Sequence, residues 1–86
     1  MSLNYYEPVK NTSIAYHKDS NGNEYFGKAA IGSKTSDARW TIFKMEYAGV
    51  DWAGKYPVDS TTGLGSDAPK FIWDNADTYA YRLLGT

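Results

Sequence analysis

The stretch 39–47, Arg-Trp-Thr-Ile-Phe-Lys-Met-Glu-Tyr, most strongly constrains the fold of this chain. Successive side chains of a β-strand point to opposite faces of a sheet. In this stretch Trp40 and Ile42 share one face, while Phe43 and Met45 share the other. A strand that is apolar on both faces is typical of the centre of a sheet, or of a strand that changes face at a bulge. We therefore predict a central strand here.

A β-hairpin is expected before this strand. The segments 14–16 and 24–30 favour strands, and Asp-Ser-Asn-Gly-Asn at 19–23 is a turn cluster with Asn-Gly at its centre. A two-residue loop would set Asp19 against Glu24, whereas a five-residue loop sets Lys18 against Glu24 and His17 against Tyr25. We prefer the five-residue loop.

Gly27 lies inside the second strand of this hairpin. Glycine weakens a strand unless the local geometry requires it. Its position therefore predicts either a bulge or the close approach of another backbone or an aromatic ring.

The rest of the chain gives shorter strand signals. A candidate strand covers 50–53, and the segment 78–84 alternates Tyr79 and Tyr81 on one face against Thr, Ala and Arg on the other, as a closing edge strand would. Between these segments, 57–69 is rich in Gly, Ser, Thr and Asp and is predicted to be a surface loop. Loops of this length are usually functional or mobile. Asp67 could cap a single helical turn after it.

Together these elements predict an all-β fold, a small antiparallel sandwich or barrel of about five to six strands with no long helix. Residues 13–86 are expected to form this single domain. Residues 1–12 carry Pro8 and show no clear period, so we expect an N-terminal arm that is ordered only when something binds it.

Size and composition point towards assembly with other chains. A chain of 86 residues without cysteine has a thin core and no disulfides, so aromatic packing or a partner must supply stability. Eight Tyr, three Trp and three Phe suit core packing, and they are also the residues enriched at interface centres.

Nucleic acid is not an expected partner. The nine basic and ten acidic residues are spread along the chain with no run of like charge, so no basic patch is predicted. The sequence contains no apolar run long enough to span a bilayer, so membrane association is not expected either.

The sequence predicts no enzyme activity, no metal site and no cofactor. His17 is the only histidine, and there is no cysteine to act as a nucleophile. The segment 19–24 superficially resembles a calcium loop, but its glycine is misplaced, and a hairpin turn explains it better. Asp-Asn-Ala-Asp at 74–77 is more typical of side chains that bond their own backbone than of metal ligands. Gly-Leu-Gly-Ser at 63–66 lacks the Lys and the long helix of a phosphate loop.

Three segments carry a resemblance to a protein family. They are 25–32 (Tyr-Phe-Gly-Lys-Ala-Ala-Ile-Gly), 35–42 (Thr-Ser-Asp-Ala-Arg-Trp-Thr-Ile) and 72–75 (Ile-Trp-Asp-Asn). The chain resembles, over about residues 25 to 84, small β-rich proteins of unassigned function that are encoded in tailed-bacteriophage genomes. That family usually has Arg after Trp-Asp-Asn, where this chain has Ala76. The resemblance brings no catalytic set with it. The matching residues Trp40 and Trp73, together with Ile42, are predicted to be core residues.

The resemblance implies a virion structural protein of a tailed phage, made in the host cytoplasm. We expect a component of the tail tip, tail fibre or adsorption apparatus, or otherwise a capsid-decorating protein. It would bind other virion proteins and form a homo-oligomer. Its candidate contacts are Tyr5 and Tyr6 in the arm, and Tyr79 and Tyr81 on the closing strand.

A carbohydrate-binding module is the alternative, with exposed rings stacked on the sugars of a host-surface glycan. A shallow row of exposed rings beside Asp or Asn would favour sugar binding, whereas a wide apolar patch that fits another copy would favour assembly.

Overall fold

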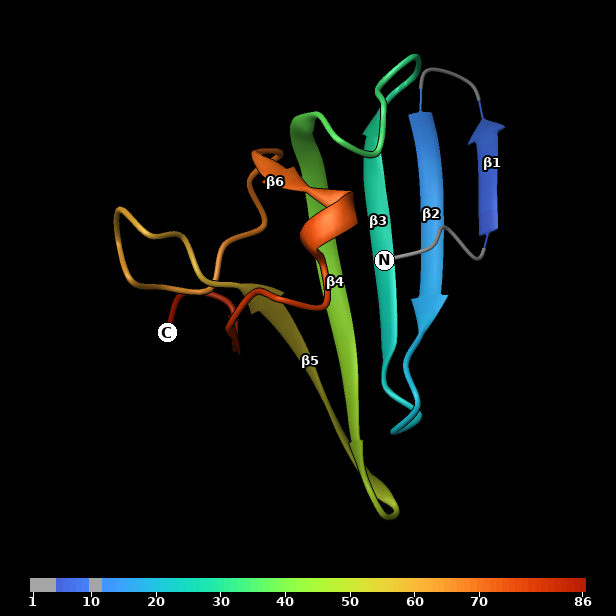
Figure 1. The fold of residues 1–86 in the computed structure, drawn as a ribbon. Helices are drawn as coiled ribbons and strands as arrows, with labels where there is room; N and C mark the ends of the chain where they lie inside the picture. The colour runs from blue at the N-terminus through green and yellow to red at the C-terminus, as the bar shows by residue number, and fades with distance from the viewer. Residues whose placement is uncertain (1–4, 10–11) are drawn as a thin grey trace.

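The computed structural model describes the backbone of residues 5–9 and 12–86, and the side chains of 12–86. The described chain is all-β and antiparallel, as predicted (Figure 1). The strands follow the order β1-β2-β3-β4-β5-β7 in one open sheet, and β6 pairs with β4 outside this path. The sheet is not closed into a barrel, and no long helix occurs within the described residues. In chain order the elements are β1 (Tyr5–Val9), β2 (Thr12–Lys18), β3 (Glu24–Ala30), β4 (Ala38–Ala48), β5 (Asp51–Pro57), β6 (Phe71–Ile72), the 3₁₀ helix η1 (Trp73–Asn75) and β7 (Tyr81–Arg82).

The β2–β3 hairpin has the register predicted for a five-residue loop. Lys18 lies opposite Glu24, and His17 lies opposite Tyr25. The carboxylate of Asp19 organises the turn, because its Oδ1 accepts hydrogen bonds from the backbone N–H groups of residues 21 and 23 at 2.8 and 3.0 Å. Both oxygens of this side chain are thus committed to the turn and to the Tyr25 hydroxyl, which donates to Oδ2. The segment 19–24 is therefore a hairpin turn.

Residues 5–9, which the sequence places in an arm, form β1 and pair with β2. Tyr5 and Tyr6 lie opposite Tyr16 and Ala15 in this register. The side chains of Tyr5 and Tyr6 lie outside the described residues, as do residues 1–4 and 10–11.

β4 is the central strand and, at eleven residues, the longest. It pairs with β3 and β5, and near its start with β6. On one face Trp40 and Ile42 are fully buried. On the other face Phe43 and Met45 are only half-buried. β4 is therefore apolar on both faces, but only the face with Trp40 and Ile42 lies in the core, while the face with Phe43 and Met45 lies at the surface.

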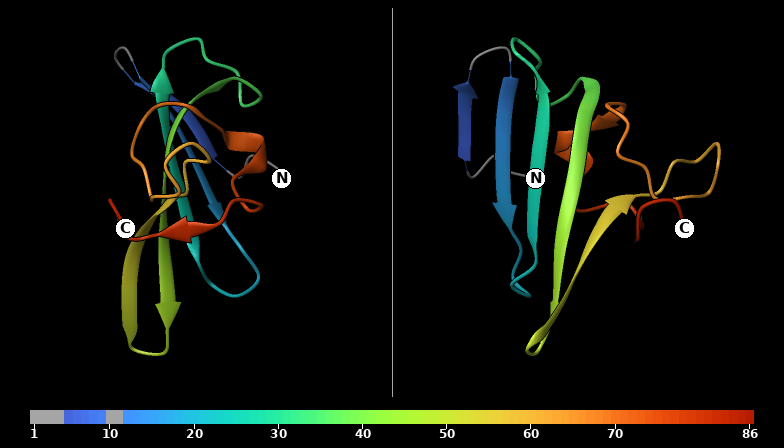
Figure 2. Two further views of the ribbon diagram at one scale, coloured as in Figure 1. Left: turned by 90° about the vertical axis from the view of Figure 1, so that its left-hand side faces the viewer. Right: turned by 180° about the vertical axis from the view of Figure 1, so that it is seen from behind.

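The segment from β6 through η1 to β7 covers one face of the sheet (Figures 1 and 2). Its fully buried Trp73 packs against Trp40 with ring centroids 6.0 Å apart. A Cβ atom placed on Gly27 would lie 2.5 Å from Cε3 of Trp73. The predicted close approach of a ring to Gly27 is therefore confirmed. Below, we call this side of the sheet the covered face.

The closing strand is much shorter than the predicted 78–84. Only Tyr81–Arg82 pair with β5, and Thr78 lies in a turn. The hydroxyl of Tyr79 accepts a hydrogen bond from the Ile72 N–H at 2.9 Å, and the hydroxyl of Tyr81 donates to the Ala76 carbonyl. These bonds hold the segment in an irregular path against the core, which prevents an extended ladder.

The 57–69 loop is more ordered than its composition suggests. Val58 bridges Gly65, and the backbone of Asp59 exchanges hydrogen bonds with residues 63 and 64. The carboxylate of Asp59 binds Lys70 Nζ at 2.8 Å. No helical turn follows Asp67, because the chain extends directly into β6, and η1 begins only at Trp73.

Candidate interaction surface on the open face of the sheet

The face of β2–β5 opposite to Trp40 and Trp73 has no described segment across its centre (Figure 2, right), and residues 67–69 reach it only at its edge beside Thr41. We call it the open face. Its membership follows from strand alternation and from the register, since residues directly opposite each other in antiparallel strands share a face. Its residues are Ile14, Tyr16, Lys18, Glu24, Phe26, Lys28, Thr41, Phe43, Met45, Tyr47, Trp52, Gly54 and Tyr56.

Four aromatic rings form a continuous row across the open face. Ring centroids lie 5.3 Å apart from Tyr16 to Phe26, 6.2 Å from Phe26 to Phe43, and 5.3 Å from Phe43 to Tyr56. Because Phe26 is the direct cross-strand partner of both Tyr16 and Phe43, the row runs perpendicular to the strands. We call these four residues the aromatic row.

Gly54 on β5 gives Phe43 its position in the row. A Cβ atom at this glycine would come within 2.6 Å of Cζ of Phe43. The ring therefore lies down over the glycine backbone, towards Tyr56, and is half-buried. Phe26, which has no such glycine beneath its ring, stays 38% exposed.

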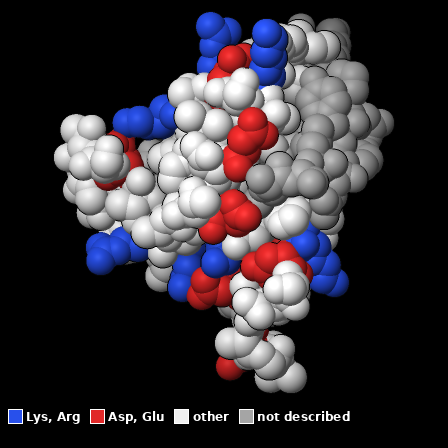
Figure 3. Space-filling view, in the orientation of Figure 1, with Lys and Arg blue, Asp and Glu red and all other residues white. Residues whose placement is uncertain are grey.

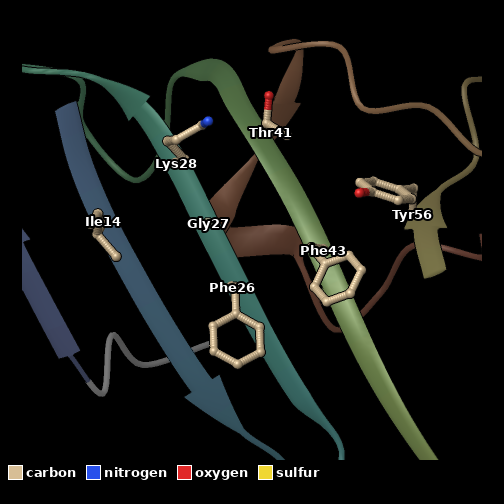
Figure 4. Close-up of a pocket in the computed structure, with 7 residues that line it drawn as sticks. All are labelled: Ile14, Phe26, Gly27, Lys28, Thr41, Phe43 and Tyr56. Carbon is tan, nitrogen blue, oxygen red and sulfur yellow. The ribbon is translucent and has the colours of Figure 1, made fainter. Parts of the chain in front are cut away.

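A shallow depression of about 320 Å³ lies beside the row (Figure 4). The figure shows Phe26, Phe43 and Lys28 standing around it on the same side of the sheet. Its lining is mainly apolar, and the Thr41 hydroxyl is already bonded to the Asp67 carbonyl at 2.9 Å. No carboxylate lines it, so the depression can contact an apolar surface but offers no acid–base pair. The lining residues are Ile14, Phe26, Gly27, Lys28, Thr41, Phe43 and Tyr56.

One end of the open face carries a carboxylate held by two phenols. Glu24 accepts hydrogen bonds from the hydroxyls of Tyr16 and Tyr47, the second at 2.6 Å. The bond from Tyr16, followed by that from Tyr47, lowers the pKa of Glu24. The same bond to Glu24 raises the pKa of Tyr16 to about 12. At neutral pH this site is therefore a fixed negative charge beside neutral phenols.

The covered face has its own cluster of charges and rings. Glu46 binds Lys55 at 2.7 Å and Lys44 at 3.2 Å. The ammonium of Lys44 also lies over the rings of Tyr25 and Tyr81, at 5.5 and 5.2 Å from their centroids. Burial raises the pKa of Tyr81. This cluster joins the closing segment to β4 and β5, so its role is structural. Over this side acidic and basic side chains are interspersed, and no broad basic patch is visible (Figure 3).

The four tyrosines expected to make contacts do not form one surface. Tyr79 and Tyr81 are half-buried, pack against the core, and use their hydroxyls within the chain. The side chains of Tyr5 and Tyr6 lie outside the described residues. By contrast, Trp40, Ile42 and Trp73 each lie fully buried in the core.

The described residues contain no group of three or more His, Cys, Asp and Glu side chains that could hold a metal ion. His17 packs its ring against Tyr25 at 5.8 Å between centroids. Within 5–9 and 12–86, none of the helical turns has the length and apolar character needed to cross a bilayer.

Sequence reasoning missed the aromatic row. The alternation of β4 placed Phe43 opposite Trp40 and Ile42, but nothing in the sequence reasoning placed Phe26 on that face or predicted that the rings would line up across the strands. Comparison with protein-family models, with curated proteins and with solved structures finds no match for this chain. The resemblance to phage-encoded proteins therefore stays a prediction.

Proposed function

We propose that this chain is a structural component of a tailed-phage virion and that it acts by binding another protein chain through its open face. The aromatic row is the observation that carries the proposal. Four adjacent rings span four strands on a face whose centre no described segment covers. The centre of a protein interface is typically rich in aromatic residues and poor in charged ones.

The energetics of so small a domain support the same proposal. The core has one layer of side chains between the sheet and the closing segment, and its largest members are Trp40 and Trp73. Covering the open face would remove further apolar area from water at roughly 25 cal/mol per Å². Binding a partner would therefore stabilise the fold of this chain and would also join the chain to its neighbour.

Within the virion, the resemblance favours the tail tip, tail fibre or adsorption apparatus, with capsid decoration as the other position. Each of these positions requires repeated contacts between chains, and none requires a catalytic site. The open face meets that requirement because it presents an apolar centre with charged residues, Glu24 and Lys28, on either side of it.

Glycan binding is the second candidate, and one observation favours it. At the tip of the β4–β5 hairpin, Trp52 is 64% exposed and lies opposite Tyr47, which is 42% exposed. Sugar stacking needs a flat platform, however, and neighbouring rings of the aromatic row are tilted by 39 to 62° to one another. The row therefore suits an interdigitating protein surface better than a sugar face.

The test uses purified particles of the phage that encodes this chain. We expect mass spectrometry to find the chain at a fixed ratio to the other virion proteins. Phe26→Thr keeps a strand-compatible residue but removes a ring of the row, and it should lower incorporation. Leu64→Thr is the matched control, because Leu64 is 42% exposed and lies in the 57–69 loop rather than on the open face. Particles without the chain would refute the virion role. Equal incorporation of both variants would refute the open face as the contact.

A further inference from the structure

We propose that the open face binds a second copy of this chain, and that the two sheets pack face to face with their β3 strands antiparallel. The proposal rests on the proposed function only in taking the open face as a protein-binding surface. It adds the identity of the partner and the symmetry of the contact.

The exposed residues of β3 form a self-complementary sequence. Glu24, Phe26 and Lys28 occur at every second position and so share the open face. With a rise of about 3.4 Å per residue, each charge lies roughly 7 Å along the strand from Phe26, one on either side. A surface with opposite charges equally spaced about an apolar centre can pair with a rotated copy of itself.

The aromatic row supplies the symmetry axis. In a two-fold interface, residue i of one copy meets residue j of the other, and j meets i. The aromatic row runs perpendicular to the strands. A two-fold axis along the row therefore places the rings of one copy on those of the other and makes the strands of the two copies antiparallel. Glu24 of each copy then lies opposite Lys28 of the second copy. An axis parallel to β3 would instead place Glu24 over Glu24 and Lys28 over Lys28. Charge therefore selects the antiparallel arrangement.

Both charges have bonding capacity to spare. An ionised carboxylate offers about four lone-pair sites, and only two of those on Glu24 are used by the phenols of Tyr16 and Tyr47. Lys28 is exposed and forms no ion pair with any residue that the structure describes. Lys18 also lies beside Glu24, but it sits exposed at the end of β2, where its charge is at the rim and contributes little.

The dimensions of the molecule allow such a contact. It measures 35 × 29 × 21 Å, and the shortest of these dimensions is perpendicular to the plane of the sheet (Figure 2). The open face of β2–β5 occupies part of the broad 35 × 29 Å side of the molecule. The depression beside Phe26 gives the facing ring of the second copy a place to enter.

The experiment is sedimentation velocity across a concentration series, with native mass spectrometry to identify the species. We expect the wild-type chain to dimerise. Glu24→Lys and Lys28→Glu each replace two attractive pairs by two repulsive ones, so each variant alone should dimerise at least about tenfold more weakly. A mixture of the two variants restores both attractive pairs. We expect it to form a 1:1 heterodimer with near wild-type affinity, while Leu64→Thr dimerises normally.

Glu24→Lys also removes the acceptor of two phenols and could impair folding. Lys28→Gln and Lys28→Glu remove no hydrogen bond of the described structure, so they form an independent series. Dimerisation should weaken from wild type to Gln to Glu. A monomer at every concentration would overturn the proposal, as would a dimer that neither charge reversal weakens. A monomer whose incorporation into particles depends on Phe26 would leave the proposed function intact, whereas a dimer absent from particles would refute that function alone.

Discussion

Gly27 lies directly against the indole of Trp73, so closely that a Cβ atom there would sit 2.5 Å from Cε3 of the ring. The contact joins the middle of β3 to η1, 46 positions later in the chain, and it fixes how near the closing segment approaches the sheet. Trp73 cannot move aside, because it is fully buried and packs against Trp40.

Gly27→Ala should therefore destabilise the protein by about 1–3 kcal/mol, the usual range for overpacking a core. Gly54→Ala is the control, since its Cβ atom would approach Phe43 at a similar 2.6 Å. Phe43 lies on the open face and has room to move, so the second variant should lose less stability. Urea unfolding followed by tryptophan fluorescence measures both. Equal losses would show that the two rings are equally confined.

Tyr79→Phe should cost about 1–2 kcal/mol, because it leaves the Ile72 N–H without its hydrogen-bond acceptor. The matched control is Tyr56→Phe, since the Tyr56 hydroxyl has no hydrogen-bond partner within the part of the chain that the structure describes. We expect the control to stay within about 0.5 kcal/mol of wild type. Thermal unfolding by circular dichroism compares them, and similar losses for both would contradict a specific role for the Tyr79 hydroxyl.

Acid should weaken the fold partly through Glu46. Hydrogen bonds from Lys55 and then Lys44 lower the pKa of this carboxyl in the folded state. A carboxyl whose folded pKa lies below its unfolded value of about 4.3 stabilises the protein above that pH and loses this contribution as the pH falls through the folded pKa. Glu46→Gln should therefore flatten the decline of unfolding free energy between neutral pH and about pH 3.

Asp51→Asn is the comparison for this experiment, because Asp51 is exposed and forms no ion pair with the other described residues. Its stability profile should follow that of the wild type. Urea unfolding at a series of pH values gives the slopes. A Glu46→Gln profile parallel to wild type would exclude this carboxyl as a source of acid sensitivity.

The 57–69 loop should loosen when the Asp59 carboxylate is removed. This side chain accepts a hydrogen bond from the Thr61 N–H at 2.8 Å and binds Lys70. In Asp59→Ala we expect the amide hydrogens of Thr61 and Gly63 to exchange about tenfold faster, with β3 unaffected. Asp67→Ala should change little, since only the backbone carbonyl of Asp67 takes part in the Thr41 contact. Unchanged exchange in Asp59→Ala would assign the order of the loop to its backbone bonds.

Local rules were enough to predict the β2–β3 hairpin. Turn residues at 19–23 set the loop length, and the loop length set the register that pairs Lys18 with Glu24. A glycine within a strand predicted either a bulge or the close approach of a backbone or ring at Gly27, and the structure shows the ring of Trp73 there. Each of these inferences depends on neighbours in sequence or on a steric requirement of one position.

The closing segment could not be predicted in this way. Tyr79 and Tyr81 alternate like strand residues, yet their conformation is decided by hydroxyl contacts to residues 72 and 76 and by packing against the core. The same long-range packing decides that Trp40 lies inside and Phe43 outside. The open face, and with it the candidate interaction surface, is therefore a property of tertiary structure that the period-two pattern of β4 leaves undetermined.

The position of Trp73 after β2, β3 and β4 in the chain also bears on when the protein folds. β2, β3 and β4 are synthesised first, but the covered face stays exposed to water until residues 71–81 have left the ribosome, so Trp40 remains solvated until then. The core is thus completed only after residues 71–81 have emerged, and until then the nascent chain presents two apolar faces that a chaperone or a neighbouring nascent chain can bind.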